Sequence, residues 1–225
     1  MIYTVVDQIR DELKRRVMSG DLRLGSRIFE DGIAAEFEVS RSAVREAVRL
    51  LEQEGLVVRE AHRGLYVASP SYRDACDAAQ LRAVLEAEAV RLSPPPGAGI
   101  VEELESICRE FERLEGGAEH IGAVDLDRTF HTLIAQGSRN EMLLRKYHEL
   151  DGPIAIFFHW FMAKVPSRIV GIADRHRLLV RAFALGDPGI YALAVEEHYT
   201  QAVADLARDL PESARADREP MRRVT

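Results

Sequence analysis

The chain has 225 residues, of which 47% are hydrophobic and 30% charged, a composition that supports a packed core and excludes intrinsic disorder. Its net charge is −7, and positions 1–70 hold 11 basic and 12 acidic residues, which excludes nucleic-acid binding through a uniformly basic surface. The longest apolar stretch, residues 154–165, is shorter than the roughly 20 residues of a membrane span, so we expect no transmembrane helix.

The N-terminus lacks the basic and apolar regions of a secretion signal. The chain has only two cysteines, Cys76 and Cys108, and both fall in segments with helical periodicity. We therefore expect a protein of the reducing cytoplasm rather than one held together by disulfides.

The first 70 residues predict three helices followed by a β-hairpin. Val6, Ile9, Leu13 and Val17 recur at helical spacing, and Gly20 ends this first helix. The other predicted elements are a second helix over about 31–37, a third from the N-cap Ser40 to Gly55, and strands over 56–58 and 65–67. This is the element order of a winged helix-turn-helix.

Beyond Pro70 we find no further convincing strand pattern. Proline and glycine clusters divide the rest of the chain into six predicted helices, at about 72–92, 100–115, 119–136, 140–164, 169–185 and 188–209. Helices of this number and length indicate a single bundle. We therefore predict a mainly α protein, with a winged helix-turn-helix over residues 1–70 and an all-α antiparallel six-helix bundle over residues 71–225.

The third predicted helix carries the side chains that we expect to read DNA. Arg41, Arg45 and Arg49 recur every four residues, so they form one exposed stripe. Arginines near the start of a helix can each donate two hydrogen bonds to a guanine in the major groove. Ser40 and Ser42 lie where hydroxyl and backbone N–H groups bind phosphate oxygens. Taken alone, the stripe could also be an ordinary solvated face, but the order of elements around it favours DNA binding.

The tip of the predicted hairpin, His62, Arg63 and Gly64, is small and basic enough to approach a minor groove or the phosphate backbone. A two-fold symmetric protein matches a two-fold symmetric operator. The expected partner is therefore double-stranded DNA with a palindromic sequence, bound by a homodimer.

A second group of residues, in the predicted bundle, has the composition of a metal site. Asp127 and His131 lie one helical turn apart and could act together as a two-ligand arm, with His176 and His198 on two later helices. One carboxylate and three imidazoles suit Zn²⁺, Ni²⁺, Mn²⁺ or Fe²⁺. A chain with seven histidines also produces such spacings by chance, so ordinary solvated or capping histidines remain an alternative.

Two further side chains could bind an effector in the same region. The guanidinium of Arg82 suits a carboxylate ligand, although an ion pair with Glu86, one helical turn later, is an equal alternative. Asn140 could donate its amide to an effector or could cap a helix. His148 and His159 are interpreted as ordinary packing or surface histidines.

Residues 5–68 resemble the DNA-binding domain of the GntR family of bacterial regulators. The matching stretches are residues 20–25, 34–41, 44–48, 51–56 and 63–67. The resemblance implies that bases and phosphates are contacted by Ser40, Arg41, Ser42, Arg45 and Gly64. Leu24 and Ala43 stand where the family usually has proline, which alters the stiffness of two turns but leaves the arginine stripe intact.

Residues 71–210 resemble the FCD ligand-binding domain of one GntR subfamily, and the helix number resembles its VanR-type branch. The matching segments are residues 82–86 and 127–131 with 137–140, and the closing motif is matched at His176, Ala182, Gly186, Asp187 and His198. The resemblance implies a divalent metal ion, with a small carboxylate effector bound to it, and the metal ligands Asp127, His131, His176 and His198. Residues 92–96 depart from the alanine run that usually ends the opening helix of this domain.

We therefore predict a transcriptional regulator, most simply a repressor and not an enzyme, whose affinities for DNA and for a small organic acid are reciprocally coupled. One alternative is a metal-dependent enzyme with a DNA-targeting domain, for which only Glu86 and Glu141 are candidate general bases. The other is a metal-free regulator whose pocket takes an apolar acyl ligand. In either kind of regulator, residues 157–161 are a candidate wall of the pocket.

Overall fold

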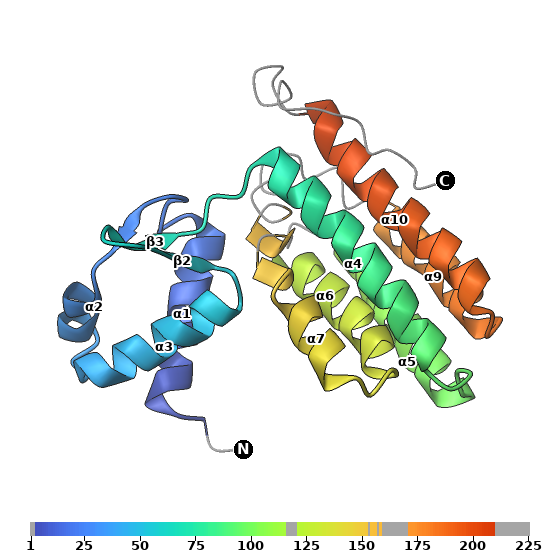
Figure 1. The fold of residues 1–225 in the computed structure, drawn as a ribbon, viewed down its shortest axis with the longest axis horizontal. Helices are drawn as coiled ribbons and strands as arrows, with labels where there is room; N and C mark the ends of the chain where they lie inside the picture. Colours follow the sequence, from blue (N-terminus) through green and yellow to red (C-terminus); the bar gives the residue numbers. More distant parts are fainter. Residues whose placement is uncertain (1–2, 116–120, 153, 157, 159–170, 210–225) are drawn as a thin grey trace.

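A computed structural model describes residues 3–115, 121–152, 154–156, 158 and 171–209 of the chain. Figure 1 shows three helices and a small sheet at one side, and a group of long helices at the other. The predicted fold class, a winged helix-turn-helix followed by a helical region, is the one observed.

The N-terminal region has six elements. These are α1 (Val5–Ser19), β1 (Arg27–Ile28), α2 (Glu30–Glu36), α3 (Arg41–Gln53), β2 (Val57–Glu60) and β3 (Gly64–Val67). The two predicted strands pair antiparallel, with Val57 opposite Val67. A third strand, β1, was not predicted; it adds to the free edge of β3, so that the sheet order is β1-β3-β2.

Local signals in the sequence fix the ends of these helices. Thr4 and Asp7 form a capping box at the start of α1, and Gly20 ends that helix with a φ of 81°, which favours glycine. Ser40 caps α3 by accepting a hydrogen bond from the N–H of Ala43. One face of α3 forms the centre of the region's core, with four fully buried side chains, Val44, Ala47, Val48 and Leu51.

The C-terminal region is helical throughout its described residues. Its elements are α4 (Tyr72–Leu92), α5 (Ala98–Glu115), α6 (Ile121–Gln136), α7 (Glu141–His148), α9 (Ile172–Ala184) and α10 (Pro188–Asp209). The long helix α4 packs most extensively against α10, and α5 against α9, as Figure 1 shows. Aromatic and aliphatic side chains from five of these helices form the core between them. Cys76 and Cys108 form no disulfide with each other.

The structure differs from the single helix predicted over residues 140–164. Helix α7 ends at His148, and the N–H of Leu150 bonds to the carbonyl of Tyr147, only three residues back, which tightens the last turn. Helical backbone resumes at Asp151, as far as the described residues of 151–158 show. Gly152 and Pro153 follow this break within three residues, and the predicted helix ran through this turn signal because apolar residues continue on both sides of it.

Gly152 and Ile156, which follow the break after α7, contact the N-terminal region. Ile156 is 2% exposed and belongs to the hydrophobic core of the N-terminal region. Gly152 approaches the backbone at the end of α3 so closely that a Cβ atom there would lie 1.8 Å from the carbonyl oxygen of Glu54. This position therefore needs glycine for close backbone approach rather than for an unusual φ angle.

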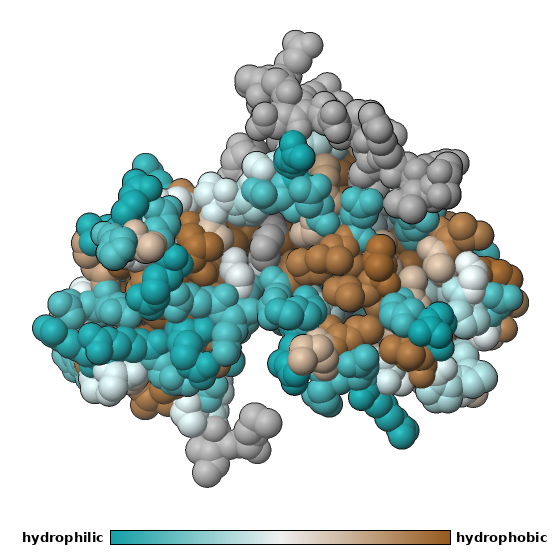
Figure 2. All heavy atoms as spheres, in the orientation of Figure 1, coloured by the Kyte–Doolittle hydropathy of each residue, from teal (hydrophilic) through white to brown (hydrophobic). Residues whose placement is uncertain are grey.

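None of the helices in the described part of the chain combines the length and the hydropathy that a membrane crossing needs. Figure 2 shows hydrophilic side chains over most of the visible N-terminal surface and a cluster of apolar ones over α4. Leu81 and Val84 of α4 are 48% and 59% exposed and contribute to this apolar surface.

The substitution Val48→Ala should destabilise the N-terminal region by roughly 2 kcal/mol, because it removes two buried methyl groups and leaves a cavity. Urea unfolding followed by circular dichroism measures the effect. Val58→Ala is the matched control, since Val58 is 42% exposed and its loss should change the stability by less than about 0.5 kcal/mol. Equal effects of the two substitutions would contradict the assignment of α3 to the core.

Candidate metal centre and DNA-reading helix

Three helices bring Asp127, His131, His176 and His198 together. Asp127 and His131 lie on α6, His176 on α9 and His198 on α10. One potential ligand atom from each residue lies within 4.8 Å of the others. The four residues named by the sequence are therefore a single cluster in space, although 71 positions separate the first from the last.

The nitrogen atoms of this cluster fit a bound cation. The Nε2 atom of His176 lies 3.2 Å from a carboxylate oxygen of Asp127, and that of His131 lies 3.7 Å from the same oxygen. Both Nε2 atoms, and the Nδ1 atom of His198, are buried and have no hydrogen-bond partner. Leaving three such atoms unsatisfied is costly, and a metal ion accepting their lone pairs would remove that cost.

The other ring nitrogens of two of these histidines are held by protein groups. Nδ1 of His176 donates to the carbonyl oxygen of Ile172 at 2.8 Å. Nδ1 of His131 lies 3.0 Å from each carboxylate oxygen of Glu86. Hydrogen bonds of this kind fix the tautomer of a metal-binding histidine and orient its ring.

Burial and neighbouring charges shift the pKa values of two members of the cluster, Asp127 and His198. Burial alone would raise the pKa of Asp127, but His131, His176 and Arg82 lower it well below its usual range. Burial, together with the neighbouring His176 and His131, lowers the pKa of His198 well below that of a free histidine. An ionised carboxylate and neutral imidazoles are the forms that coordinate cations.

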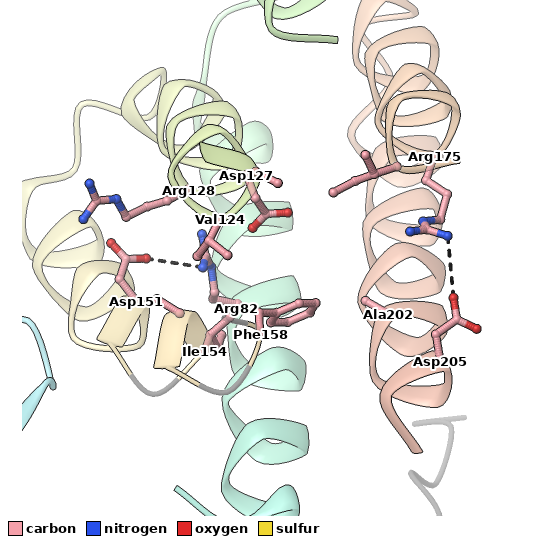
Figure 3. Close-up of a pocket in the computed structure, with 13 residues that line it drawn as sticks. Arg82, Val124, Asp127, Arg128, Asp151, Ile154, Phe158, Arg175, Ala202 and Asp205 are labelled. Carbon is pink, nitrogen blue, oxygen red and sulfur yellow. Dashed lines mark ion pairs between the residues drawn. The ribbon is translucent and has the colours of Figure 1, made fainter. Parts of the chain in front are cut away.

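A pocket opens beside Asp127. Its walls include the apolar Val124, Ile154 and Phe158 together with the charged Arg82 and Arg175, as Figure 3 shows. The cavity volume is about 50 Å³, which is room for a few water molecules and is small for a ligand site. Asp127 belongs to both the pocket and the histidine cluster, so a ligand in the pocket would adjoin the cluster.

Arg82 is 1% exposed and forms its ion pair with Asp151, not with Glu86. The distance from Nη1 to the Asp151 carboxylate is 3.3 Å, and the guanidinium lies over the ring of Tyr147 at 4.6 Å from its centroid. The Nε and Nη2 atoms of Arg82 are buried without a hydrogen-bond partner. Two donors of one guanidinium are therefore available to a ligand.

The remaining candidates lie elsewhere. Asn140 is the N-cap of α7, where its side-chain oxygen accepts from the N–H of Leu143, and it does not line this pocket in the described structure. The side chain of His148 is 45% exposed, and its Nδ1 atom lies 2.9 Å from a carboxylate oxygen of Asp151. His159 lies outside the described residues.

Sequence reasoning missed the groups that surround the cluster. Glu86 was considered only as a partner of Arg82 or as a general base, and Asp151 was not singled out. The buried tyrosines Tyr147, Tyr191 and Tyr199 were not considered either. The sequence signal for these polar residues is their position on otherwise apolar faces of predicted helices. Such a position indicates that a side chain is buried, but it does not indicate which residue it pairs with.

The predicted DNA-reading stripe is exposed on α3. The side chains of Arg41, Arg45 and Arg49 are 69%, 70% and 52% exposed. They lie near acidic residues, Arg41 3.0 Å from Asp31 and Arg45 3.7 Å from Glu30. Such exposed pairs contribute little to stability and exchange readily for other anions, such as phosphate groups.

The Ser40 and Ser42 hydroxyls lie 2.9 Å apart at the start of the same helix. At the hairpin tip, His62 has a left-handed backbone with a φ of 62°, and Arg63 is 72% exposed beside Glu60. Gly64 lies against the guanidinium of Arg27, which would be 3.3 Å from an added Cβ atom. The recognition helix and the hairpin tip therefore present basic and hydroxyl groups to solvent.

Comparison with known families agrees with this architecture. Residues 5–67 match the model described as bacterial regulatory proteins, gntR family, and residues 77–201 match the FCD domain. The chain belongs to the GntR family of bacterial regulatory proteins and carries an FCD domain. The two matches leave residues 68–76 between them, and the boundary at residue 70 stays a prediction.

Its relatives are regulators. The chain is 30% identical over 196 residues to the "Probable D-xylose utilization operon transcriptional repressor" of Paenarthrobacter nicotinovorans, covering 87% of this chain and 85% of that one. It is 25% identical over 211 residues to the gluconate operon transcriptional repressor of Bacillus subtilis (strain 168), covering 88% and 83%. The protein is therefore a transcriptional regulator, and the enzyme alternative finds no support among its relatives.

Solved structures show the same fold. E. coli McbR/YncC superposes with a TM-score of 0.76 at 20% identity, covering 92% of this chain and 99% of that one. A GntR transcriptional regulator from Rhodococcus sp. RHA1 gives a TM-score of 0.72 at 23% identity, again covering 92% and 99%. At these identities the likeness shows the fold alone.

The substitution His176→Ala should abolish stoichiometric zinc uptake by protein purified without a histidine tag, because it removes one of three buried imidazoles. Elemental analysis after reconstitution and desalting measures the effect. His62→Ala, in the hairpin tip, is the control and should bind as much zinc as the wild type. Zinc uptake by His176→Ala equal to that of the wild type would exclude His176 as a ligand.

Proposed function

We propose that the protein is a transcriptional repressor that binds a palindromic operator as a homodimer and responds to a small carboxylate held beside a metal ion in its helical region. The observation that carries the sensing part is the convergence, in one pocket, of Asp127 from the histidine cluster and the unsatisfied guanidinium of Arg82. DNA release on effector binding is the proposed direction of the response.

The metal would be held by Asp127, His131, His176 and His198, and a divalent ion of the zinc, nickel, manganese or iron type suits this donor set. When bound, such an ion supplies positive charge that attracts an anion. The residues of the chain complete the site, since Arg82 offers two free donors to a carboxylate and the apolar wall of the pocket excludes water from it.

The effector class follows from these groups. A guanidinium with two available N–H donors suits the two oxygens of a carboxylate, and the small cavity of about 50 Å³ favours a small ligand. The gluconate repressor among the relatives is named for an operon of a sugar acid. We therefore place small hydroxy acids and sugar acids first among the effector candidates.

In DNA binding, Arg41, Arg45 and Arg49 read the bases. Phosphate groups are contacted by the two serines at the start of α3 and by the hairpin tip, that is, by Ser40, Ser42, His62, Arg63 and Gly64. Support comes from the exposure of all three arginines on one side of a capped helix. The apolar surface over α4, with Leu81 and Val84, is the candidate dimer contact.

The operator-binding part is tested with Arg45→Ala. If Arg45 reads a base, its loss should cost about 1–3 kcal/mol of specific binding and flatten discrimination at that base pair. The operator is first selected from random duplexes with wild-type protein, and affinities are then measured by gel shift at fixed salt. Arg91→Ala, which removes an exposed arginine from α4, is the control and should bind like the wild type. An unchanged affinity of Arg45→Ala would reject the role of this residue.

The sensing part is tested by thermal shift of the zinc-loaded protein with D-gluconate and other small carboxylates. A bound acid raises the melting temperature by mass action. The metal-free alternative predicts the same shift in protein without metal, and a better response to fatty acyl ligands. Either of these results would overturn the proposed metal-bound carboxylate.

A further inference from the structure

Glu86 lies at the centre of the helical region and is fully buried. His131 reaches it from α6, Tyr147 from α7 and two tyrosines from α10. The hydroxyl oxygen of Tyr147 is 2.6 Å from the carboxylate, that of Tyr191 2.5 Å and that of Tyr199 3.2 Å. An isolated carboxylate in this position would be strongly unfavourable, so the donors around it are needed for its burial.

The donor groups determine which nitrogen of His131 carries the proton. The hydroxyl groups of Tyr147, Tyr191 and Tyr199 surround the Glu86 carboxylate at 2.5–3.2 Å, and such a set of O–H donors suits an ionised carboxylate. An ionised carboxylate only accepts hydrogen bonds, so Nδ1 of His131 must be the donor to it. In a neutral imidazole this leaves the lone pair on Nε2, the atom that faces Asp127.

We propose that Glu86 is the positioning residue of the metal centre: with its three tyrosines it holds His131 in the tautomer and orientation that present Nε2 to the ion. This rests on the proposed metal site. A purely structural role would not need a buried charge, because well-packed apolar side chains stabilise a core at least as well. Tyr147 also contacts Arg82 through its ring, so the same network borders the effector pocket.

The test is Glu86→Gln, in which an amide can donate as well as accept and no longer selects one tautomer. Nitrogen-15 NMR of the zinc-free protein should show His131 with Nδ1 protonated in the wild type and a mixture in the variant. The zinc affinity should fall about 10–100-fold. The control Glu88→Gln changes an exposed glutamate of the same helix, paired with Arg91, and should leave both readouts unchanged.

Unchanged tautomer and zinc affinity in Glu86→Gln would overturn the proposal. If Glu86→Gln does not fold, Tyr191→Phe takes its place: it keeps the carboxylate but removes one hydrogen bond, and it should weaken zinc binding several-fold. No effect of Tyr191→Phe would then overturn the proposal. Failure of the wild type to bind zinc would instead refute the metal site itself, which separates the two outcomes.

A second, independent contact involves Asp151. This residue forms the buried ion pair with Arg82, as Figure 3 shows, and it begins the segment that touches the N-terminal region. Its neighbour Gly152 packs on the backbone of Glu54, the C-cap of α3, and Ile156 enters the core around that helix. The pocket and the end of the recognition helix are thus joined by residues 151–156.

The Arg82–Asp151 pair is incomplete. The Asp151 oxygen nearest to Arg82 has no hydrogen bond, and two guanidinium nitrogens also lack one. A ligand carboxylate could accept from both of these nitrogens, which a single oxygen at 3.3 Å does not do. The other Asp151 oxygen already contacts His148, whose side chain is 45% exposed, so Asp151 has a partner on the solvent side.

We infer that the effector carboxylate competes with Asp151 for Arg82, and that loss of this ion pair loosens residues 151–156 from the end of α3 and lowers the affinity for DNA. This rests on the proposed function and specifies how its two binding events are coupled. The coupling arises because the guanidinium of Arg82 can pair with only one carboxylate at a time. In the DNA-binding state this carboxylate is that of Asp151, and in the effector-bound state it is that of the ligand.

The test is Asp151→Asn, which keeps the size of the side chain but removes its charge. Without any effector, the variant should bind the selected operator about tenfold more weakly than the wild type. Zinc-loaded Asp151→Asn should also bind the probe D-gluconate more tightly than the wild type, since the competing carboxylate is gone. Asp174→Asn is the matched control: it removes the charge of an exposed aspartate of α9, paired with Arg177 outside the pocket, and should leave operator affinity unchanged.

Operator affinity of Asp151→Asn equal to that of the wild type would overturn this coupling. If the variant is unstable, Gly152→Ala supplies a second test, because the added methyl group must push the segment away from Glu54 and should lower operator affinity with Arg82 and Asp151 intact. Wild-type operator affinity in Gly152→Ala would overturn the coupling as well. Failure of the wild type to select any operator would instead refute the proposed function.

Discussion

The buried carboxylate of Glu86 lies at the centre of the helical region. A carboxylate can be buried at tolerable cost only when its oxygens accept several hydrogen bonds, and Glu86 accepts them from side chains of three other helices. This requirement fixes how α6, α7 and α10 are placed along α4. Since His131 is one of the donors, the packing of the helices and the orientation of the histidine cluster have the same physical origin.

The two ends of the molecule use arginine in opposite ways. On α3 the arginines are exposed and pair loosely with neighbouring acids, so that exchanging those partners for phosphates or base edges costs little. Arg82 is buried over an aromatic ring and has a single acidic partner. Changing the partner of a buried charge has large energetic consequences, which suits a residue that responds to a ligand.

Much of the fold could be predicted because its signals are local. The predicted range 72–92 coincides with α4, which a capping box and apolar periodicity mark, and α10 begins at Pro188 as predicted. The two-residue strand β1 carries no such signal, because it exists only by pairing with β3. The break after His148 was missed because the prediction followed the apolar periodicity through Gly152 and Pro153, a pair of residues that often marks the end of a helix.

The sequence by itself determined the class of the protein, the arginine stripe and the identity of the four clustered residues, since spacing and family motifs are properties of the chain. Only the tertiary structure decided the partners. Arg82 pairs with Asp151, 69 residues away, rather than with Glu86 one turn later, and Glu86 binds His131 instead. The choice between a near and a distant partner depends on which charges are buried together, and burial is set by how the helices pack.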